Sequence, residues 1–212
     1  MKVLVKVCGL TGVEEARMLV EEKVDMGGVV LFYERSKRYC TPEKAGKIVR
    51  VLKNGGVKAV AVTVSPTAEQ VREIGEIGFD YLQVHGVLEK EVLEQSRVPV
   101  IRAFNVSNMG EMEEVQGNEK VVGWLFDAAV PGEGKTFDWG VLKGLERDGR
   151  RFFLAGGLTA ENVEEAIERT KPDAVDVSSG VEYEDTEEIV KKGYRKDRGK
   201  IREFVRRVKN YG

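Results

Sequence analysis

The sequence predicts an α/β fold in which eight parallel strands alternate with helices and close into a single (β/α)8 barrel. Apolar runs rich in Val, Ile, Leu and Phe recur along the chain at 2–7, 28–33, 57–64, 80–84, 98–104, 121–126, 151–155 and 173–177. These runs show little polar alternation, as is typical of strands buried on both faces of a parallel sheet. Helical patterns separate the runs and no linker interrupts them, so residues 1–212 are expected to form one domain.

Helix start signals follow several of the apolar runs. The expected caps are all threonines: Thr11 with Glu14, Thr67 with Gln70, Thr41 before Pro42, and Thr159. The last helical pattern places apolar residues at 201, 204, 205 and 208, which is the spacing of one helix face. An open, doubly wound sheet built from the same alternation is the alternative fold.

Composition narrows the class of protein. The chain is 42% hydrophobic and 33% charged, as expected of a soluble globular protein, and no apolar stretch approaches membrane-spanning length. Met1-Lys2 leads straight into a strand, so no signal peptide is expected. A formal net charge of -2 gives no sign of nucleic-acid binding. The two cysteines, Cys8 and Cys40, have neither metal-ligand spacing nor the pattern of a disulfide framework. We therefore expect a cytosolic protein; whether it is a monomer or a homodimer stays open.

Two ionisable residues stand at the ends of predicted strands. Cys8 follows the run 2–7, and Asp127 follows the run 121–126. Taken singly, a free cysteine is more often a small buried hydrophobe, and a strand-end Asp is usually a turn or cap residue. Because the carboxyl ends of barrel strands meet at one reactive face, the pair suggests an acid and a base that converge on one site.

Other polar or small residues fall on the same predicted face. They are Arg38, His85-Gly86, Gly156-Gly157 and the stretch Asp176 through Gly180. The two Gly/Ser clusters follow the seventh and eighth strands, where barrels commonly bind a phosphate through backbone N–H groups. Neither cluster contains Lys or Arg, so we expect backbone donors to dominate. His85, the only histidine, fits a packing role as well as a chemical one.

The stretch Gly132–Thr136 is similar to the end of a P-loop, but we do not interpret it as one. The first glycine that a P-loop requires is replaced by Ala129, Pro131 lies inside the motif, and no helix follows at once. A flexible loop over the active site fits this stretch better.

Six segments resemble, in this order, phosphoribosylanthranilate isomerase of tryptophan biosynthesis. They are KVCGLT (6–11), SKRY (36–39), LQVHG (82–86), GKTFDW (134–139), LAGGL with Asn162-Val163 (154–163), and VDVSSGVE (175–182). The resemblance covers nearly the whole chain. Each segment alone is a weak signal, but six at matching spacing are specific.

The resemblance implies a (β/α)8 barrel that converts N-(5-phosphoribosyl)anthranilate to 1-(2-carboxyphenylamino)-1-deoxyribulose 5-phosphate. This Amadori rearrangement requires no cofactor and no metal. By the same resemblance, Cys8 is the general base and Asp127 the general acid. Arg38 is expected to bind the anthranilate carboxylate, and His85 and Asp176 are further substrate-binding candidates. The phosphate is expected at Gly156, Gly157, Ser178, Ser179 and Gly180.

The chemistry suits these residue types. Opening the ribose ring needs a proton on the ring oxygen, which a carboxyl with a raised pKa can supply. A base then removes a proton from the adjacent sugar carbon. A thiol has an ordinary pKa of about 8.5, so Cys8 needs local stabilisation as thiolate.

The chain departs from the family pattern in three places. Thr63 and Ser65 stand where the family usually has an aromatic residue and an asparagine. The turn expected near Met26-Gly27-Gly28 is one residue longer. The stretch Tyr183–Lys192 is additional, and we expect a surface insertion there rather than an altered lid beside the phosphate.

Two other readings remain alternatives. A different phosphosugar barrel, such as an indole-glycerol-phosphate or thiamine-phosphate enzyme, would share the phosphate loops but would not explain Cys8, Asp127 and Arg38 together. A non-catalytic phosphosugar-binding protein would need neither acid nor base. Broader specificity, for instance toward the related histidine-pathway aminoaldose, stays open.

Overall fold

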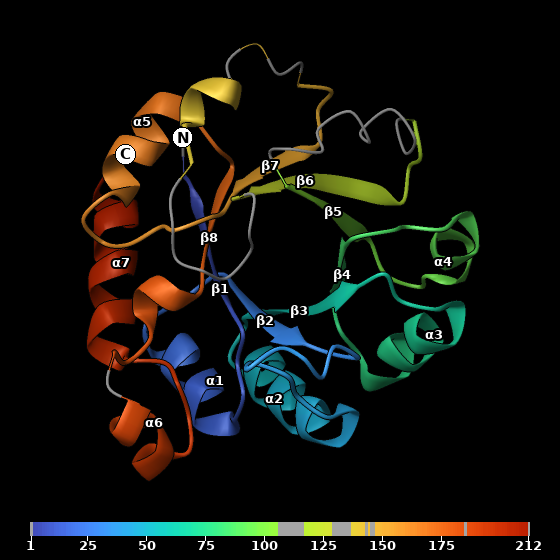
Figure 1. Ribbon diagram of the computed structural model, residues 1–212, viewed down its shortest axis with the longest axis horizontal. Coiled ribbons are helices and arrows are strands. Elements are labelled where there is room, and N and C mark those ends of the chain that lie inside the picture. The colour runs from blue at the N-terminus through green and yellow to red at the C-terminus, as the bar shows by residue number, and fades with distance from the viewer. Residues whose placement is uncertain are drawn as a thin grey trace.

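Eight parallel strands form a closed barrel in the computed structural model, which describes residues 2–105, 117–128, 137–142, 144, 147–184 and 186–211 (Figure 1). The strands are β1 (Leu4–Cys8), β2 (Met26–Val30), β3 (Lys58–Val64), β4 (Tyr81–His85), β5 (Val100–Asn105), β6 (Val121–Asp127), β7 (Arg151–Leu154) and β8 (Ala174–Val177). Each strand pairs in parallel with the next, and β8 pairs with β1 at Val5 and Val175. This closure confirms the predicted (β/α)8 barrel and excludes the open sheet, whose edge strands would stay unpaired.

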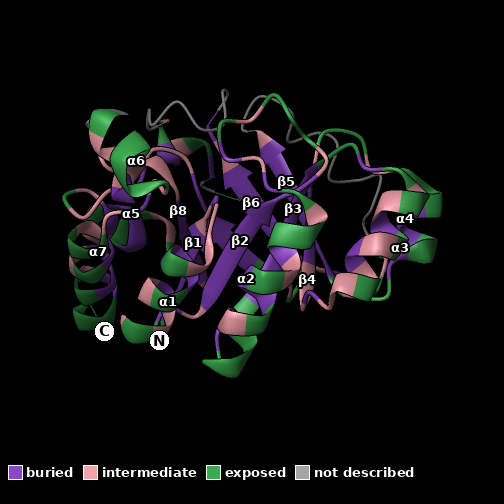
Figure 2. Ribbon diagram, turned by 90° about the horizontal axis from the view of Figure 1, so that it is seen from below, coloured by how far each residue is buried: buried purple, intermediate pink, exposed green. Residues whose placement is uncertain are grey.

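Helices surround the barrel on its outside (Figure 1). They are α1 (Val13–Glu21), α2 (Pro42–Asn54), α3 (Ala68–Ile77), α4 (Lys90–Gln95), α5 (Val163–Thr170), α6 (Thr186–Lys192) and α7 (Arg198–Asn210), with short 3-10 turns η2 (Trp139–Leu142) and η3 (Ser179–Val181). In Figure 2 the strands are mostly buried, whereas the helices are buried only on the side that faces the sheet. In the described part of the chain, no helix is both long and apolar enough to cross a bilayer.

Two apolar cores follow from the alternation of side chains along each strand. The inner core fills the barrel with residues such as Val60, Leu125 and Phe153. The outer core lies between sheet and helices and includes Val5, Val7 and the apolar face of α7. Because successive side chains of β1 point to opposite faces, Leu4, Lys6 and Cys8 all face the barrel interior. Lys6 can therefore stand in an otherwise apolar strand, because it meets the polar groups of the interior.

The second strand begins earlier than the sequence predicted. The expected run 28–33 corresponds to β2 at Met26–Val30, and the chain leaves the sheet at Phe32, whose φ is 56°. The glycines that were interpreted as a turn lie inside the strand. A Cβ on Gly27 would stand 2.9 Å from Leu52 Cδ1, so close packing of α2 against β2 requires glycine there.

Two of the four predicted helix caps are confirmed. Thr41 caps α2, whose first residue is Pro42, and Thr67 forms a capping box with Gln70 on α3. The other two predictions were wrong because the helices begin later. The N-cap of α1 is Gly12, and that of α5 is Asn162 rather than Thr159.

The carboxylate that completes the cap of α1 is Glu15 rather than Glu14. Glu15 is fully buried and accepts hydrogen bonds from the backbone of Thr11 and Gly12. Its other oxygen accepts from the amides of Arg195 and Lys196, at 2.8 and 2.9 Å. This one side chain therefore joins the start of α1 to the segment that precedes α7.

The additional stretch Tyr183–Lys192 contains the helix α6, in which Val190 is 82% exposed. The two ends of this insertion are joined by backbone pairing. Tyr183 N–H donates to Arg195 O at 2.9 Å, and Glu182 and Lys196 form an antiparallel β-bridge. None of the described residues of this stretch lines the central cavity, which supports the expected surface insertion. The predicted loop at Gly132–Thr136 lies outside the described residues.

Candidate active site

A cavity of about 910 Å³ opens at the carboxyl ends of the barrel strands. Cys8, His85 and Asp127 are the last residues of β1, β4 and β6, and all three line this cavity. Arg38, from the loop after β2, and Asp176, from β8, line it as well. The barrel therefore brings together side chains that are separated by up to 168 positions in the sequence, as the strand-end argument predicted.

Cys8 lies beside a buried ion pair. Lys6 is the register partner of Asp176 across the β1–β8 junction, and Lys6 Nζ lies 2.8 Å from Asp176 Oδ2. The register partner of Cys8 is Gly28 on β2. A Cβ on Gly28 would stand 3.0 Å from Cys8 Sγ and 3.3 Å from Lys6 Nζ, so this glycine leaves the space that both groups occupy.

The surroundings of Cys8 act on its pKa in opposite directions. Burial raises the pKa of the thiol, and the Asp176 carboxylate adds to this effect. The positive charges of Lys6, Lys196 and Arg38 lower it, but the net pKa stays above the ordinary thiol value. The thiolate is therefore a minor species in the unliganded protein near neutral pH.

Asp127 stands on β6 with most of its carboxyl removed from water. Burial raises the pKa of Asp127 to about 6, although Ala128 N–H donates to its Oδ1 at 2.8 Å and opposes the shift. The value of about 6 also includes charge repulsion from Asp176, which raises this pKa, and the positive charges of Lys6 and Arg38, which lower it. A substantial fraction of Asp127 is therefore protonated slightly below neutral pH, which is the state that a general acid requires.

Arg38 is held by a carboxylate that the sequence analysis did not assign to the site. Its Nε lies 2.6 Å and its Nη2 3.1 Å from the two oxygens of Glu182, which is buried. This bidentate pair fixes the plane of the guanidinium. Among the described residues Nη1 has no acceptor, so this nitrogen is available to a ligand in the cavity. Gly9 makes room for the arginine, because a Cβ there would stand 2.3 Å from Arg38 Cδ.

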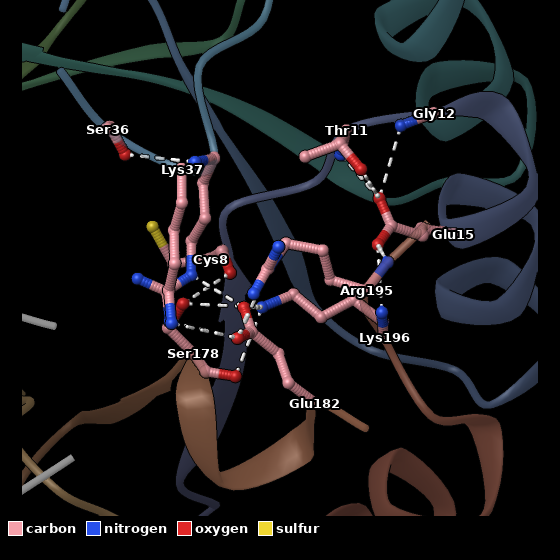
Figure 3. A network of polar contacts seen from close by, with 11 residues as sticks. Cys8, Thr11, Gly12, Glu15, Ser36, Lys37, Ser178, Glu182, Arg195 and Lys196 are labelled. Atoms are coloured by element: carbon pink, nitrogen blue, oxygen red, sulfur yellow. Dashed lines mark hydrogen bonds and ion pairs between the residues drawn. The ribbon is translucent and has the colours of Figure 1, made fainter. Parts of the chain in front are cut away.

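Glu182 is the centre of a larger polar network (Figure 3). Lys196 Nζ lies 3.0 Å and Arg195 Nε 3.5 Å from its oxygens. Burial alone would raise the pKa of Glu182, but Lys196 and Arg38 together lower it to about 2. The carboxylate is therefore ionised throughout the physiological range and joins the loop after β2 to the segment before α7.

The same network reaches the strand that carries the thiol. Lys196 Nζ also donates to Ser178 O at 3.1 Å, and Ser178 Oγ donates to Cys8 O at 2.9 Å (Figure 3). Lys196 is fully buried. The sequence analysis did not identify this lysine as a site residue, because no local pattern shows which carboxylate it contacts.

His85 is half-buried and lies beside the buried Gln83 on the inward face of β4. Gln83 Nε2 and His85 Nε2 are 2.8 Å apart, and Gln83 Oε1 has no partner among the described residues. Burial together with the charges of Lys6 and Arg102 lowers the pKa of His85 to about 4. The imidazole is therefore neutral near pH 7 and can bind a ligand only through hydrogen bonds. Gln83, which also lines the cavity, was missed as a site residue.

The two predicted phosphate loops lie next to each other at the mouth of the barrel. Gly156 and Gly157 both have positive φ, 88° and 64°, and line the cavity with Ser178 and Ser179. Gly180 is not part of the lining. It packs against the preceding loop, where a Cβ would stand 2.1 Å from Leu158 O. Small residues therefore bring the two backbones together, as a site formed by backbone N–H groups requires.

Comparison with known proteins agrees with this geometry. A family model described as N-(5'phosphoribosyl)anthranilate (PRA) isomerase matches residues 5–207. An N-(5'-phosphoribosyl)anthranilate isomerase from Aquifex aeolicus is 41% identical over 213 residues, which cover 98% of this chain and 99% of that protein. The chain belongs to the phosphoribosylanthranilate isomerase family.

Solved structures of phosphoribosylanthranilate isomerases share the whole barrel. The crystal structure of the Thermotoga maritima isomerase is 35% identical, with a TM-score of 0.82 and coverage of 98% of this chain and 99% of that one. A phosphoribosyl anthranilate isomerase in complex with reduced 1-(o-carboxyphenylamino)-1-deoxyribulose 5-phosphate is 34% identical, with a TM-score of 0.80 and the same coverage. These matches confirm the expected family and enzyme class, an isomerase of tryptophan biosynthesis.

Proposed function

We propose that this isomerase converts N-(5-phosphoribosyl)anthranilate to the corresponding 1-deoxyribulose 5-phosphate with Asp127 as general acid and Cys8 as general base. The observation that carries the proposal is that both groups line one cavity from strands β6 and β1, and that burial has already raised the pKa of Asp127 to about 6. A carboxyl in this state can donate a proton without a metal.

The first step opens the ribose ring. Asp127 protonates the ring oxygen while the lone pair of the anthranilate nitrogen forms a C=N bond to the anomeric carbon, and the C–O bond breaks. The product is a protonated imine, whose nitrogen keeps its hydrogen, with a free hydroxyl on the sugar chain, and Asp127 becomes a carboxylate. The charge of Lys6 faces this carboxylate and favours its ionised form.

The second step moves a proton from the carbon next to the imine. The Cys8 thiolate removes this proton and becomes a thiol, the C–H electron pair forms a C=C bond, and the C=N π electrons return to the nitrogen as its lone pair. The resulting enolamine then tautomerises to the ketone. The protonated imine is a strong electron sink, so a base of modest strength is sufficient.

The remaining residues bind the substrate. Arg38 presents Nη1 to the anthranilate carboxylate while Glu182 holds its other edge. Asp176 Oδ1 is buried and has no partner in the described part of the chain, so it is suited to accept a hydrogen bond from a sugar hydroxyl, with neutral His85 as a second polar contact. Gly156, Gly157, Ser178 and Ser179 bind the phosphate, with Gly180 supporting the loop. We further propose a cytosolic location for this small-molecule reaction.

The test is an assay of purified protein with freshly prepared N-(5-phosphoribosyl)anthranilate, in which loss of anthranilate fluorescence is followed without metal or nucleotide. Cys8→Ala and Asp127→Asn should each lower kcat by at least roughly 10²-fold, the contribution expected of one acid or base, with smaller effects on KM. Cys40→Ala is the matched control: Cys40 is buried in the outer core, so this variant should retain turnover. Near-normal turnover by Cys8→Ala would exclude the proposed base.

A further inference from the structure

The proposed proton transfers do not explain why a buried lysine lies next to the thiol. Lys6 is fully buried inside the barrel, on the same strand as the thiol. An ammonium removed from water is costly unless it is paired, and Asp176 provides the pairing at 2.8 Å. Replacing such a pair by apolar side chains is often neutral or stabilising, so stability alone gives no reason to place it beside the reacting groups.

The position of Lys6 is specific. It lies two residues before Cys8 on β1, so both side chains face the barrel interior, and Gly28 opposite them has no side chain to separate them. The Lys6 ammonium donates to Asp176 Oδ2, and its charge also acts on the Cys8 thiol. Burial lowers the pKa of Lys6, but the two acidic neighbours raise it more, so the ammonium stays charged.

We infer that the Lys6–Asp176 pair is a positioning device for the thiol, in which Lys6 is the counter-charge that stabilises the Cys8 thiolate and Asp176 fixes the ammonium in place. This inference rests on the proposed role of Cys8 as base. A thiolate formed by proton loss would otherwise be a buried anion without a cation beside it.

The other charged groups around Cys8 do not replace Lys6. Lys196 and Arg38 lower the pKa of the thiol less than Lys6 does, and both are bound to Glu182. Asp176 faces Cys8 from β8 and opposes thiolate formation, but its effect is smaller than that of Lys6. Asp127 faces the same cavity from β6. The pair as a whole therefore favours the thiolate, although its two members act in opposite directions.

Because Lys6 and Asp176 act in opposite directions on the pKa of Cys8, the inference can be tested without measuring turnover. In a Cys40→Ala background, the rate of Cys8 alkylation by iodoacetamide is measured against pH, and its midpoint reports the pKa of Cys8. Lys6→Met should raise the midpoint by about one to three pH units, the range expected on losing a close opposite charge. Asp176→Asn should lower the midpoint, because a neighbouring negative charge is removed and Lys6 retains Cys8 as its acidic partner.

Two further variants complete the design. Lys6→Met/Asp176→Asn replaces the pair by neutral side chains of similar size and should fold even if Lys6→Met does not. Its midpoint should still lie above that of the parent protein, because the loss of Lys6 outweighs the loss of Asp176. The matched control is Lys58→Met, which removes a lysine paired with Asp80 at the opposite ends of the strands and should leave the midpoint unchanged.

A midpoint that does not rise in the double variant, or that does not fall in Asp176→Asn, would overturn the inference. A merely structural role of the pair would not produce shifts of opposite sign. The outcome is separable from the proposed function: if Cys8→Ala retains turnover, the assignment of the base is wrong whatever the alkylation midpoints are.

Discussion

At the scale of single residues, the proposed acid and the proposed base are mostly in the unreactive protonation states before substrate binds. The pKa of Asp127 is about 6, and burial raises the pKa of Cys8 above its ordinary value. The reactive form, with Asp127 protonated and Cys8 ionised, is therefore a small fraction of the free enzyme. Between the two pKa values this fraction is constant, because the loss of protonated Asp127 with rising pH equals the gain in thiolate.

This order of pKa values predicts a bell-shaped dependence of kcat/KM on pH with a broad plateau. Below about pH 6 the rate should fall because the thiolate is lost while Asp127 is already fully protonated. Above the thiol pKa it should fall because protonated Asp127 is lost. The measurement is kcat/KM from pH 5 to pH 10 at constant ionic strength.

The substrate's phosphate also titrates near pH 6, so a control is needed. In Asp127→Asn the residual rate should follow the thiol alone and rise with pH until Cys8 is ionised. An acid limb near pH 6 that persists unchanged in Asp127→Asn would belong to the phosphate and would contradict the assignment of that limb to Asp127.

The role of Glu182 gives a second prediction at this scale. Glu182→Gln keeps the shape of the side chain but removes the charge that holds Arg38 and Lys196. Because the guanidinium would lose its fixed plane, KM should rise by roughly ten-fold or more, with a smaller fall in kcat. The matched control is Glu184→Gln, which removes an exposed partner of Lys200 and should leave both constants unchanged.

Steady-state kinetics of the two variants and of Arg38→Ala provide the check. Arg38→Ala should raise KM at least as much as Glu182→Gln, since Glu182 acts through the arginine. A kcat that collapses in Glu182→Gln while KM stays constant would show that this carboxylate acts on the chemical step instead.

At the scale of secondary-structure elements, the glycine of β2 opposite Cys8 is constrained by its neighbours. A Cβ on Gly28 would stand 3.0 Å from Cys8 Sγ and 3.2 Å from Cys8 Cα, and a backbone atom moves less readily than a side chain. Gly28→Ala should therefore lower the free energy of unfolding by about 1–3 kcal/mol, the usual cost of overpacking, and should lower kcat by displacing the thiol.

Gly46→Ala in α2 is the matched control for this substitution. A Cβ there meets nothing within 4 Å, and an alanine inside a helix is more favourable than a glycine. It should raise the free energy of unfolding by roughly 0.5–1 kcal/mol and leave kcat unchanged. Urea unfolding of both variants is the measurement, and equal effects at the two sites would show that the space around Gly28 does not matter.

At the scale of the whole molecule, two buried groups have opposite effects on the pH dependence of stability. The folded-state pKa of His85, about 4, lies below its unfolded value of 6.5, so the unfolded state binds more protons and stability falls as pH falls through this range. The folded-state pKa of Asp127, about 6, lies above its unfolded value of 3.8, so stability rises as pH falls from 6 toward 3.8. Each contribution is on the order of 2–3 kcal/mol.

Because the two contributions oppose each other, they should largely cancel between pH 6.5 and pH 4.5 in the parent protein. Asp127→Asn should reveal the contribution of His85, with a free energy of unfolding that decreases toward pH 4.5. His85→Asn should reveal the contribution of Asp127, with a free energy of unfolding that increases. Urea unfolding at several pH values measures these slopes, and slopes of the same sign in the two variants would contradict the prediction.

Local sequence pattern was enough to predict the strands of this protein and the side chains at their carboxyl ends. Apolar runs without polar alternation predicted all eight strands, because strands buried on both faces admit few polar residues. Strand-end positions predicted that Cys8 and Asp127 would share a face, since parallel strands in a barrel point the same way. The prediction was wrong at the start of β2, and the cause is packing: Gly27 makes room for Leu52 of α2, and Gly28 makes room for Cys8 and Lys6 inside the barrel.

The tertiary structure alone decided which charges meet. Lys6 with Asp176 and Arg38 with Glu182 are pairs separated by 170 and 144 positions, and they meet only because β8 closes against β1. Burial, and with it the pKa of Asp127 and His85, likewise depends on neighbours from several strands. The sequence determined the fold and the types of residue at the strand ends because those depend on local pattern. Which charged side chains pair, and how far burial shifts the pKa of a buried group, depend on distances across the closed barrel. No local sequence pattern contains these distances.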